Sequence, residues 1–507
     1  MPSGPPTVVL ATTNGRGMGH LSRQMALALA SLGGMDPVIF SMSSAVAVAG
    51  QFDMRAEFAP GPLRGQVPRR YWDFYLAERI MALIQEVNAS AFVFDGVYPY
   101  DGVLRALRRL PDVPFIWSRR GMWKPGAGAR ALRYRRLFAA VIEPGDLASS
   151  GDAGRTAELD DARRVGPVTL AGLVRPLGRA AAREALGLDP DRPAVLITLG
   201  STRRSDLYAA YGRTVERFAA EGWQVAVTSS LIAGDGHGTR RPGEPVMISV
   251  YPLVKYLSAF DAAVTASGYN VVHELLLSAV PTLLVPNDAS VDDQDTRARV
   301  VAGQNLALAA DPERPTEFEA ALDRLLDERV RGRLRDACRD LPPPTGATEA
   351  ARAVIGLAAG GRVETAERVE WGALNAQRLA RRTLGRALPD SVATRMGRTG
   401  LLRGAPLSLS PQLLPAPDPA RPTTGLRLPP VDPQHLVVTD ALLPGLFEKR
   451  RVEHLLPGAS DAYVAERARI AAEHYRLRPT AAPVGERAQA WARLGWAAGS
   501  DEDRPEV

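Results

Sequence analysis

The chain has 507 residues, of which 46% are hydrophobic and 23% are charged, and its formal net charge is +6. That length exceeds what a single hydrophobic core usually supports, so we expect a globular protein with at least two domains. The charge is mild for this size and does not predict a nucleic-acid partner. A single cysteine, Cys338, excludes a disulfide framework and a cysteine-based metal site.

Signals for secretion or membrane insertion are also absent from the sequence pattern. No basic segment followed by an apolar run and a cleavage site is found near residue 1, and no apolar run reaches the roughly 18 to 20 residues that span a bilayer. We therefore expect a cytoplasmic protein.

Apolar runs alternate with helical patterns through the first 170 residues. The helical pattern that starts at Leu21 is expected to end at Gly33–Gly34, because glycine commonly follows a helix C-terminus. Strands that are apolar throughout and separated by helices indicate parallel βαβ units covered on both faces. The expected strands are 7–12, 37–41, 91–96, 114–118 and 139–145.

The same alternation restarts after residue 180, beyond a segment at 170–178 that we interpret as a linker. One helix is predicted at 208–222 and another from Asn270. The expected strands are 193–201, 223–230, 246–252, 262–268 and 281–287. We therefore predict an α/β protein in which two Rossmann-like domains, 1–170 and 171–357, face a cleft.

The rest of the chain has a different composition. Residues 358–403 are rich in arginine and have a helical pattern, whereas nine of the thirty residues in 404–433 are proline, which predicts an extended linker. Residues 434–507 form an extension whose role the sequence does not indicate. Arginines interleaved with leucines within 371–403 fit either contact with an anionic membrane surface or a helix packed on the first domain.

The first chemical signal is a glycine loop between the first strand and the first helix. The stretch LATTNGRGMGHLSR, residues 10–23, places His20 at the start of the helix. Its G-x-G-x-G-H spacing differs from the dinucleotide fingerprint, and the Gly-Lys-Ser/Thr of a Walker loop is missing. What remains is a tight turn that presents one imidazole to a ligand, or one in which the histidine only packs the turn.

The second signal lies within residues 265–300. An expected strand ends at Ser267–Gly268, a helix opens near Asn270, Glu274 follows one turn later, and a polar loop with an Asp–Gln pair comes after the next strand. A helix N-terminus can receive a diphosphate through its free N–H groups, and a carboxylate one turn along can accept both hydroxyls of a ribose.

Together these motifs resemble the GT-B nucleotide-sugar glycosyltransferases of the family 28 type. GRGMGH is similar to the first glycine-rich loop of that family, residues 265–300 are similar to its donor motif, and the resemblance covers roughly residues 7–357. It implies the GT-B fold, a UDP-linked sugar as donor, and transfer with inversion without a metal or a cofactor. It also implies that His20 is the general base for the acceptor hydroxyl, a role suited to an imidazole near neutral pH.

Further contacts follow from the resemblance, position by position. The expected donor contacts are Gly200, Ser201, Ser267 and Gly268 with the diphosphate, Arg203 or Arg204 as its charged partner, the backbone near Tyr251 with uracil, Glu274 with the ribose, and Asp293 and Gln294 with the sugar. The expected acceptor-side residues are Gly17, Gly19, Asp95, Arg119, Arg120 and Trp123. The stretch 117–126, which holds the last three, fits an ordinary basic surface loop equally well. The glycine-free STRRSD after the strand at 193–201 departs from the family pattern.

We therefore expect an inverting hexosyltransferase of cell-envelope or glycoconjugate biosynthesis. Its acceptor, whether a glycan, a lipid-linked sugar or a small molecule, is not indicated by the sequence, and a lipid-linked acceptor would bring the protein to the inner face of the membrane. Two alternatives stay open. One is a nucleotide-sugar hydrolase or 2-epimerase that uses the same donor site, and the other is an inactive protein of the same fold that serves as a binding or scaffold subunit.

Overall fold

The computed structural model describes residues 4–13, 18–31, 33–52, 54–59, 69–199, 205–228, 244–287, 289 and 291–360. The predicted site residues Gly17, Gly200, Ser201, Arg203 and Arg204 lie outside these ranges. So do the segments predicted beyond residue 360, apart from the antiparallel pair β14 (Val437–Val438) and β15 (Leu477–Arg478). Within the described ranges no helix combines the length and the apolar character that crossing a bilayer requires.

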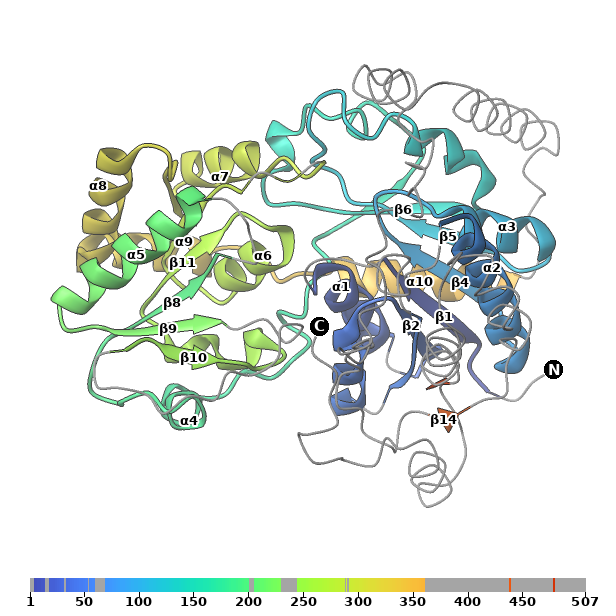
Figure 1. The fold of residues 1–507 in the computed structure, drawn as a ribbon, viewed down its shortest axis with the longest axis horizontal. Coiled ribbons are helices and arrows are strands. Elements are labelled where there is room, and N and C mark those ends of the chain that lie inside the picture. The colour runs from blue at the N-terminus through green and yellow to red at the C-terminus, as the bar shows by residue number, and fades with distance from the viewer. Residues whose placement is uncertain are drawn as a thin grey trace, which may run out of the picture.

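The first domain is built on a seven-stranded parallel sheet in the order β3-β2-β1-β4-β5-β6-β7 (Figure 1). The strands are β1 (Thr7–Thr12), β2 (Asp36–Ser41), β3 (Arg55–Phe58), β4 (Ala91–Asp95), β5 (Phe115–Ser118), β6 (Ala140–Pro144) and β7 (Arg163–Val165). Along β1, Val8 and Leu10 enter one core and Val9 and Ala11 the other, because successive side chains alternate between faces. Burial on both faces explains why these strands read as continuous apolar runs.

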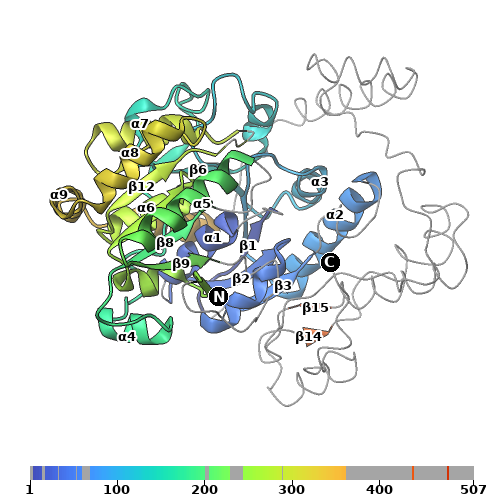
Figure 2. The same cartoon turned by 60° about the vertical axis from the view of Figure 1, so that its left-hand side comes forward.

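Helices cover both faces of this sheet. Its helices and 3₁₀ segments are α1 (Gly19–Ala30), η1 (Ser44–Phe52), α2 (Arg69–Glu86), α3 (Asp101–Arg109), η2 (Ala131–Leu137) and η3 (Ser149–Gly151). α2 and α3 lie side by side and share one core with η2 (Figure 2), whereas α1 belongs to the core on the other face. α1 ends three residues before the predicted stop at Gly33–Gly34.

The second domain repeats the plan with a six-stranded parallel sheet in the order β10-β9-β8-β11-β12-β13. The strands are β8 (Ala194–Thr198), β9 (Gln224–Thr228), β10 (Val246–Ile248), β11 (Ala262–Ala266), β12 (Thr282–Val285) and β13 (Leu308–Ala309). The helices are α4 (Arg179–Ala185), α5 (Ser205–Ala220), η4 (Leu253–Ala259), α6 (Tyr269–Leu277), α7 (Gln294–Gly303), α8 (Pro315–Leu326) and α9 (Glu328–Arg339). The two sheets confirm the predicted architecture of two Rossmann-like α/β domains.

The last described helix returns to the first domain. α10 (Gly346–Gly360) contacts α1 and the strands β4, β6 and β7, and Figure 1 shows it among the elements of the first domain. Gly346 lies so close to the backbone of Gly166 that a side chain would not fit between them. The structure therefore differs from the predicted division at residue 357, because the end of the range 171–357 packs on the first sheet.

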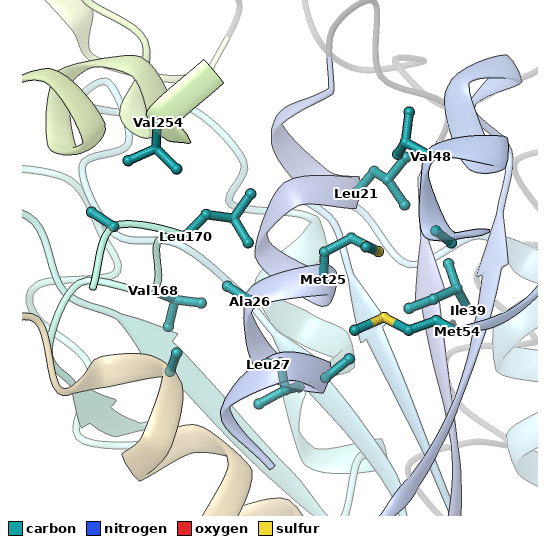
Figure 3. Packing of buried hydrophobic residues seen from close by; sticks show 14 of the residues in the cluster. Leu21, Met25, Ala26, Leu27, Ile39, Val48, Met54, Val168, Leu170 and Val254 are labelled. Atoms are coloured by element: carbon teal, nitrogen blue, oxygen red, sulfur yellow. The ribbon is translucent and has the colours of Figure 1, made fainter. Parts of the chain in front are cut away.

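One apolar core runs across the boundary between the domains. Leu21, Met25 and Ala26 of α1 share it with Val168 and Leu170 of the connecting segment, and Figure 3 shows these side chains together with Val254 of η4 from the second domain. The two sheets are therefore joined by packed side chains as well as by the chain itself.

Candidate functional site

Each sheet reverses its strand order once, between β1 and β4 in the first domain and between β8 and β11 in the second. In open α/β sheets a crevice lies at such a point, beyond the carboxyl ends of the strands, and ligands bind there. His20 follows β1 and Asp95 ends β4, whereas Ser267 and Gly268 follow β11. The two motifs found in the sequence therefore occupy corresponding places in the two domains.

His20 is held by a buried carboxylate. Its Nδ1 lies 2.5 Å from Oδ1 of Asp95, a side chain that is only 1% exposed. Asp95 also accepts hydrogen bonds from Arg23, through Nε at 3.0 Å and Nη2 at 2.5 Å, and from Ser118 Oγ at 2.8 Å. Arg23 was not anticipated from the sequence, although it follows His20 by three residues and so lies on the same face of the helix.

The charges around this pair favour a neutral imidazole beside an ionised carboxylate. Burial alone would raise the pKa of Asp95, but the neighbouring Arg23 and His20 outweigh it and hold that pKa well below its usual value. Burial lowers the pKa of His20, Arg23 and Arg120 lower it further, and Asp95 opposes them. A neutral imidazole that donates from Nδ1 to Asp95 keeps a lone pair on Nε2, which can accept a proton.

The turn before α6 has the features of an anion site. Gly268 is the N-cap of this nine-residue helix and no side chain caps its first N–H groups. Ser267 is fully buried, and its hydroxyl has no hydrogen-bond partner among the described residues. The turn is fixed by Arg297, whose Nη1 donates to the Ser267 carbonyl at 2.8 Å. An unpaired hydroxyl beside free N–H groups can receive a phosphate.

The starts of α1 and α6 touch each other across the domain boundary. Asn270 Nδ2 donates to the Gly19 carbonyl at 3.1 Å, and Asn270 Oδ1 accepts from Arg23 Nη1 at 3.2 Å. Tyr269 donates its hydroxyl to the carbonyl of Gly145 at 2.9 Å. The predicted base and the predicted phosphate turn therefore lie at one shared site.

Glu274, one turn into α6, carries a buried carboxylate. Its side chain is 7% exposed and makes no hydrogen bond or ion pair within the described residues. Burial raises its pKa to about 8. Burial raises the pKa of Tyr251, and the charge of the nearby Glu274 raises it further. The Tyr251 hydroxyl donates to Ser22 Oγ of α1 at 3.3 Å. The unpaired carboxylate has capacity for the two hydroxyls of a ribose.

An open pocket of about 610 Å³ lies beside Tyr251. The first domain contributes Phe52 to its lining, the connecting segment contributes Arg175, and the second domain contributes Lys255 and Tyr256. Aromatic rings beside two cations suit a base and a phosphate. Neither Arg175 nor Lys255 is predictable as a ligand contact from the sequence, because a cation in a linker or on a 3₁₀ turn carries no signal until the domains are packed together.

The Asp–Gln pair after β12 already has structural partners. Asp293 is the N-cap of α7, and its carboxylate accepts from the Thr296 N–H at 3.1 Å. Gln294 Oε1 accepts from the Asn287 N–H at 3.1 Å. Both side chains shape this loop, and their contact with a sugar stays a prediction.

A buried ionic network joins the same loop to the first domain. Arg297 is fully buried and donates to Asp146 Oδ2 through Nε and to Asp292 Oδ1 through Nη2, both at 2.8 Å. Arg120 Nη1 also donates to Asp292 Oδ1, at 3.2 Å. Because Asp146 and Arg120 belong to the first domain, the network connects the two domains next to the phosphate turn. The roles of Asp146, Asp292 and Arg297 could not be predicted from the sequence, because their pairing depends on how the domains dock.

The loop at 117–126 is not the basic surface loop that was one of its two interpretations. Arg119 is fully buried and pairs with Glu143 at 2.9 Å and with Asp161 at 3.1 Å. Trp123 is 2% exposed and its backbone bridges to the loop that precedes α7. Both side chains are engaged inside the protein, so their contact with an acceptor would require rearrangement and stays a prediction.

Arg120 lies at the shared site. Its guanidinium is 5.4 Å from the centre of the Tyr269 ring, and Arg23 lies 5.5 Å from the same ring. Burial leaves the Nε of Arg120 without a hydrogen-bond partner among the described residues. The start of α6 is therefore flanked by two cations of the first domain.

Within the described residues no group of three His, Cys, Asp or Glu side chains is arranged to hold a metal ion. The expectation that the reaction needs no metal and no cofactor stays a prediction.

The curated relatives described below carry one name, and no family model matches the sequence. The chain is 31% identical over 318 residues to the UDP-N-acetylglucosamine–N-acetylmuramyl-(pentapeptide) pyrophosphoryl-undecaprenol N-acetylglucosamine transferase of Rhodococcus opacus, a match that covers 59% of this chain and 78% of the relative. The protein of the same name from Nocardioides sp. is 34% identical over 141 residues, 26% of this chain and 37% of the relative. This chain therefore spans only 37% of the Nocardioides protein and 38% of the protein of the same name from Clavibacter michiganensis.

Solved structures with a similar course of the chain are more distant in sequence. The glycosyltransferase of kitacinnamycin has a TM-score of 0.47 and 20% identity, with 70% of this chain and 99% of that chain covered. MurG of Acinetobacter baumannii has a TM-score of 0.45 and 15% identity, with 69% and 99% covered.

Proposed function

Because the chain belongs to the family of UDP-N-acetylglucosamine–N-acetylmuramyl-(pentapeptide) pyrophosphoryl-undecaprenol N-acetylglucosamine transferases, we propose that it transfers a sugar from a UDP-linked donor to an acceptor hydroxyl with inversion. The observation that carries this proposal is the contact between the starts of α1 and α6, which brings His20 and the turn at Ser267–Gly268 to one site. A base and a phosphate site in contact are what transfer from a nucleotide diphosphate requires.

In the proposed reaction, Nε2 of His20 removes the proton of the acceptor hydroxyl as its oxygen attacks the anomeric carbon. The bond between that carbon and the diphosphate oxygen breaks on the opposite face, so the configuration inverts. Asp95 stabilises the imidazolium that forms, because it accepts from Nδ1. No covalent intermediate is required.

The leaving diphosphate needs positive charge close to the bond that breaks. The free N–H groups at the start of α6 and the Ser267 hydroxyl supply hydrogen bonds, and Arg120 adds a cation on the side of the first domain. Glu274 receives the ribose hydroxyls, and the pocket beside Tyr251 receives the base.

The acceptor is proposed to be lipid-linked, because the names of the relatives contain a pyrophosphoryl-undecaprenol group. Such an acceptor would place the protein at a membrane surface. We infer that this contact is peripheral.

The test is a screen of the purified full chain against UDP- and TDP-linked sugars, by calorimetry for binding and by release of nucleotide for turnover. His20→Ala should bind the donor as the wild type does and lose at least about a hundredfold in turnover. Glu274→Ala should weaken donor binding, whereas Glu317→Ala, an exposed carboxylate on α8, should change neither.

Two results would overturn the proposal. If no nucleotide or nucleotide sugar binds, the donor site does not exist and a scaffold role becomes the better reading. If nucleotide is released at full rate with water and no acceptor accelerates it, the protein is a nucleotide-sugar hydrolase on the same fold.

A further inference from the structure

The Arg23 side chain contacts the proposed base, the partner of that base and the donor helix. It is 4% exposed, and its Nη2 lies 2.9 Å from His20 Nδ1 as well as 2.5 Å from Asp95 Oδ1. On its other side, Nη1 donates to Asn270 Oδ1 at 3.2 Å. One guanidinium therefore links the imidazole, the carboxylate and the start of α6.

The Nδ1 atom of His20 can form a hydrogen bond with only one of its two neighbours, either Arg23 Nη2 or Asp95 Oδ1. A guanidinium only donates and an ionised carboxylate only accepts. If Nδ1 carried a lone pair, it would lie 2.5 Å from another acceptor, Asp95 Oδ1, and if it carries a hydrogen it donates to that oxygen. The contact with Asp95 therefore selects the Nδ1–H form, and Arg23 stands beside that N–H as a positive charge.

This positive charge opposes what Asp95 alone would do. A carboxylate next to an imidazole favours the imidazolium, which cannot act as a base. The groups that face His20 are Asp95 from the end of β4, Arg23 from α1 and Arg120 from the loop after β5, and Tyr269 of α6 lies against both arginines. Of the two cations, Arg23 is the one that pairs directly with Asp95 and shares its charge.

We propose that Arg23 is a positioning residue that keeps His20 neutral, with its hydrogen on Nδ1 and its lone pair on Nε2, and that ties this base to the donor helix through Asn270. The proposal rests on the function proposed above. A second contact joins α6 to the start of α1, because Asn270 Nδ2 donates to the carbonyl of Gly19, the residue before His20.

Two substitutions separate the charge of Arg23 from its shape. Arg23→Gln can still donate to Asp95 but carries no charge, whereas Arg23→Lys keeps the charge and loses the planar fork. Without the cation, His20 is protonated at higher pH. The acidic limb of the kcat/KM profile should therefore move up by about one pH unit or more in Arg23→Gln, and stay within a few tenths of the wild type in Arg23→Lys.

Asn270→Ala serves as the control for the tether. It removes the contact with the donor helix but leaves Arg23 on Asp95, so it should lower kcat without moving the acidic limb. If Arg23→Gln lowers the rate equally at every pH, Arg23 has only a structural role and the proposal is wrong.

A second measurement does not depend on turnover. In protein with ¹⁵N-labelled histidine, NMR reports the tautomer and the titration of His20, which is assigned from the loss of its signals in His20→Gln. The wild type should show Nδ1–H and a midpoint below that of Arg23→Gln. If the wild type turns over no sugar but this difference is found, the proposed function fails and the role of Arg23 stands. If the midpoints agree, the role of Arg23 is refuted whatever the activity.

If Arg23→Gln does not fold because it leaves Asp95 buried with less counter-charge, the charge can be removed in pairs. The midpoint of Arg23→Gln/Asp95→Asn should lie above that of Asp95→Asn alone, because only the latter keeps the cation beside His20. Equal midpoints in these two variants would overturn the proposal.

Discussion

Glu274→Gln should stabilise the free protein although it damages the donor site. The carboxylate is 7% exposed and has no partner within the described residues, and burial raises its pKa from an ordinary value of 4.5 to about 8. The folded protein therefore holds this proton more tightly than the unfolded chain does. The stabilisation due to this group is complete below about pH 4.5 and is lost as the pH rises through 8. A glutamine side chain resembles the protonated carboxyl group and does not ionise, so the variant keeps this stabilisation as the pH rises.

The size of the effect follows from the two pKa values of Glu274. At 1.4 kcal/mol per pKa unit, the free energy of unfolding of Glu274→Gln should exceed that of the wild type by less than about 1 kcal/mol at pH 5, by about 3 kcal/mol at pH 7 and by about 5 kcal/mol at pH 8.5. Urea unfolding of both proteins at these pH values measures it. In the same variant UDP should bind at least about tenfold more weakly, because a carboxamide has one acceptor oxygen where a carboxylate has two, one for each ribose hydroxyl.

Glu349 of α10 is the control with the opposite sign. Hydrogen bonds from Thr345 Oγ1 and from the Gly166 N–H hold its pKa below the ordinary value. Glu349→Gln should therefore be less stable than the wild type at pH 7, with a deficit that shrinks as the pH falls. If Glu274→Gln shows a difference that is independent of pH, or is less stable than the wild type at pH 8.5, Glu274 is not the buried, unpaired carboxylate described above.

Two further predictions concern stability. Gly346→Ala should lower the free energy of unfolding by about 1–3 kcal/mol, since its Cβ would overlap the backbone of the connecting segment. Gly356→Ala on the same helix meets open space and should raise the free energy of unfolding by about 0.5–1 kcal/mol. Equal effects of the two substitutions in thermal unfolding would contradict this packing. Arg297→Met leaves Asp146 without its bonded cation and deprives Asp292 of one of its two cations, so it should lower the free energy of unfolding by about 3–5 kcal/mol, as measured by chemical unfolding. A decrease below about 1 kcal/mol would show that the network is not buried as described.

The strands that could be predicted from the sequence are those buried on both faces. β1, β4, β8 and β11 read as apolar runs because helices cover them on each side. The edge strands β3 and β7 were missed, since they are short and the residues Arg163 and Arg164 of β7 remain exposed. Short, charged edge strands carry little hydrophobic pattern, so the sheet order could not be completed from sequence.

The site divides in the same way. His20 and the turn at Ser267–Gly268 stand out because glycine turns at helix starts leave a local signature. The partner of Asp146 and the contact of Asn270 with α1 carry none, because each joins residues more than 120 positions apart and exists only when the domains are docked. Arg23 lies between these cases. Its spacing from His20 was visible, but its role depends on a carboxylate from β4.

The return of α10 to the first domain inverts the order in which the two halves can fold during synthesis. One face of the second sheet packs in a core, with Phe218, Leu283 and Leu325, that is encoded in one uninterrupted stretch ending before Gly346. The first domain, in contrast, is complete only when Ala347, Ala350 and Val354 of α10 cover α1. A nascent chain that has not yet emerged from the ribosome to residue 360 can therefore complete this core of the second domain while the first domain is unfinished. The half that is translated first is completed last.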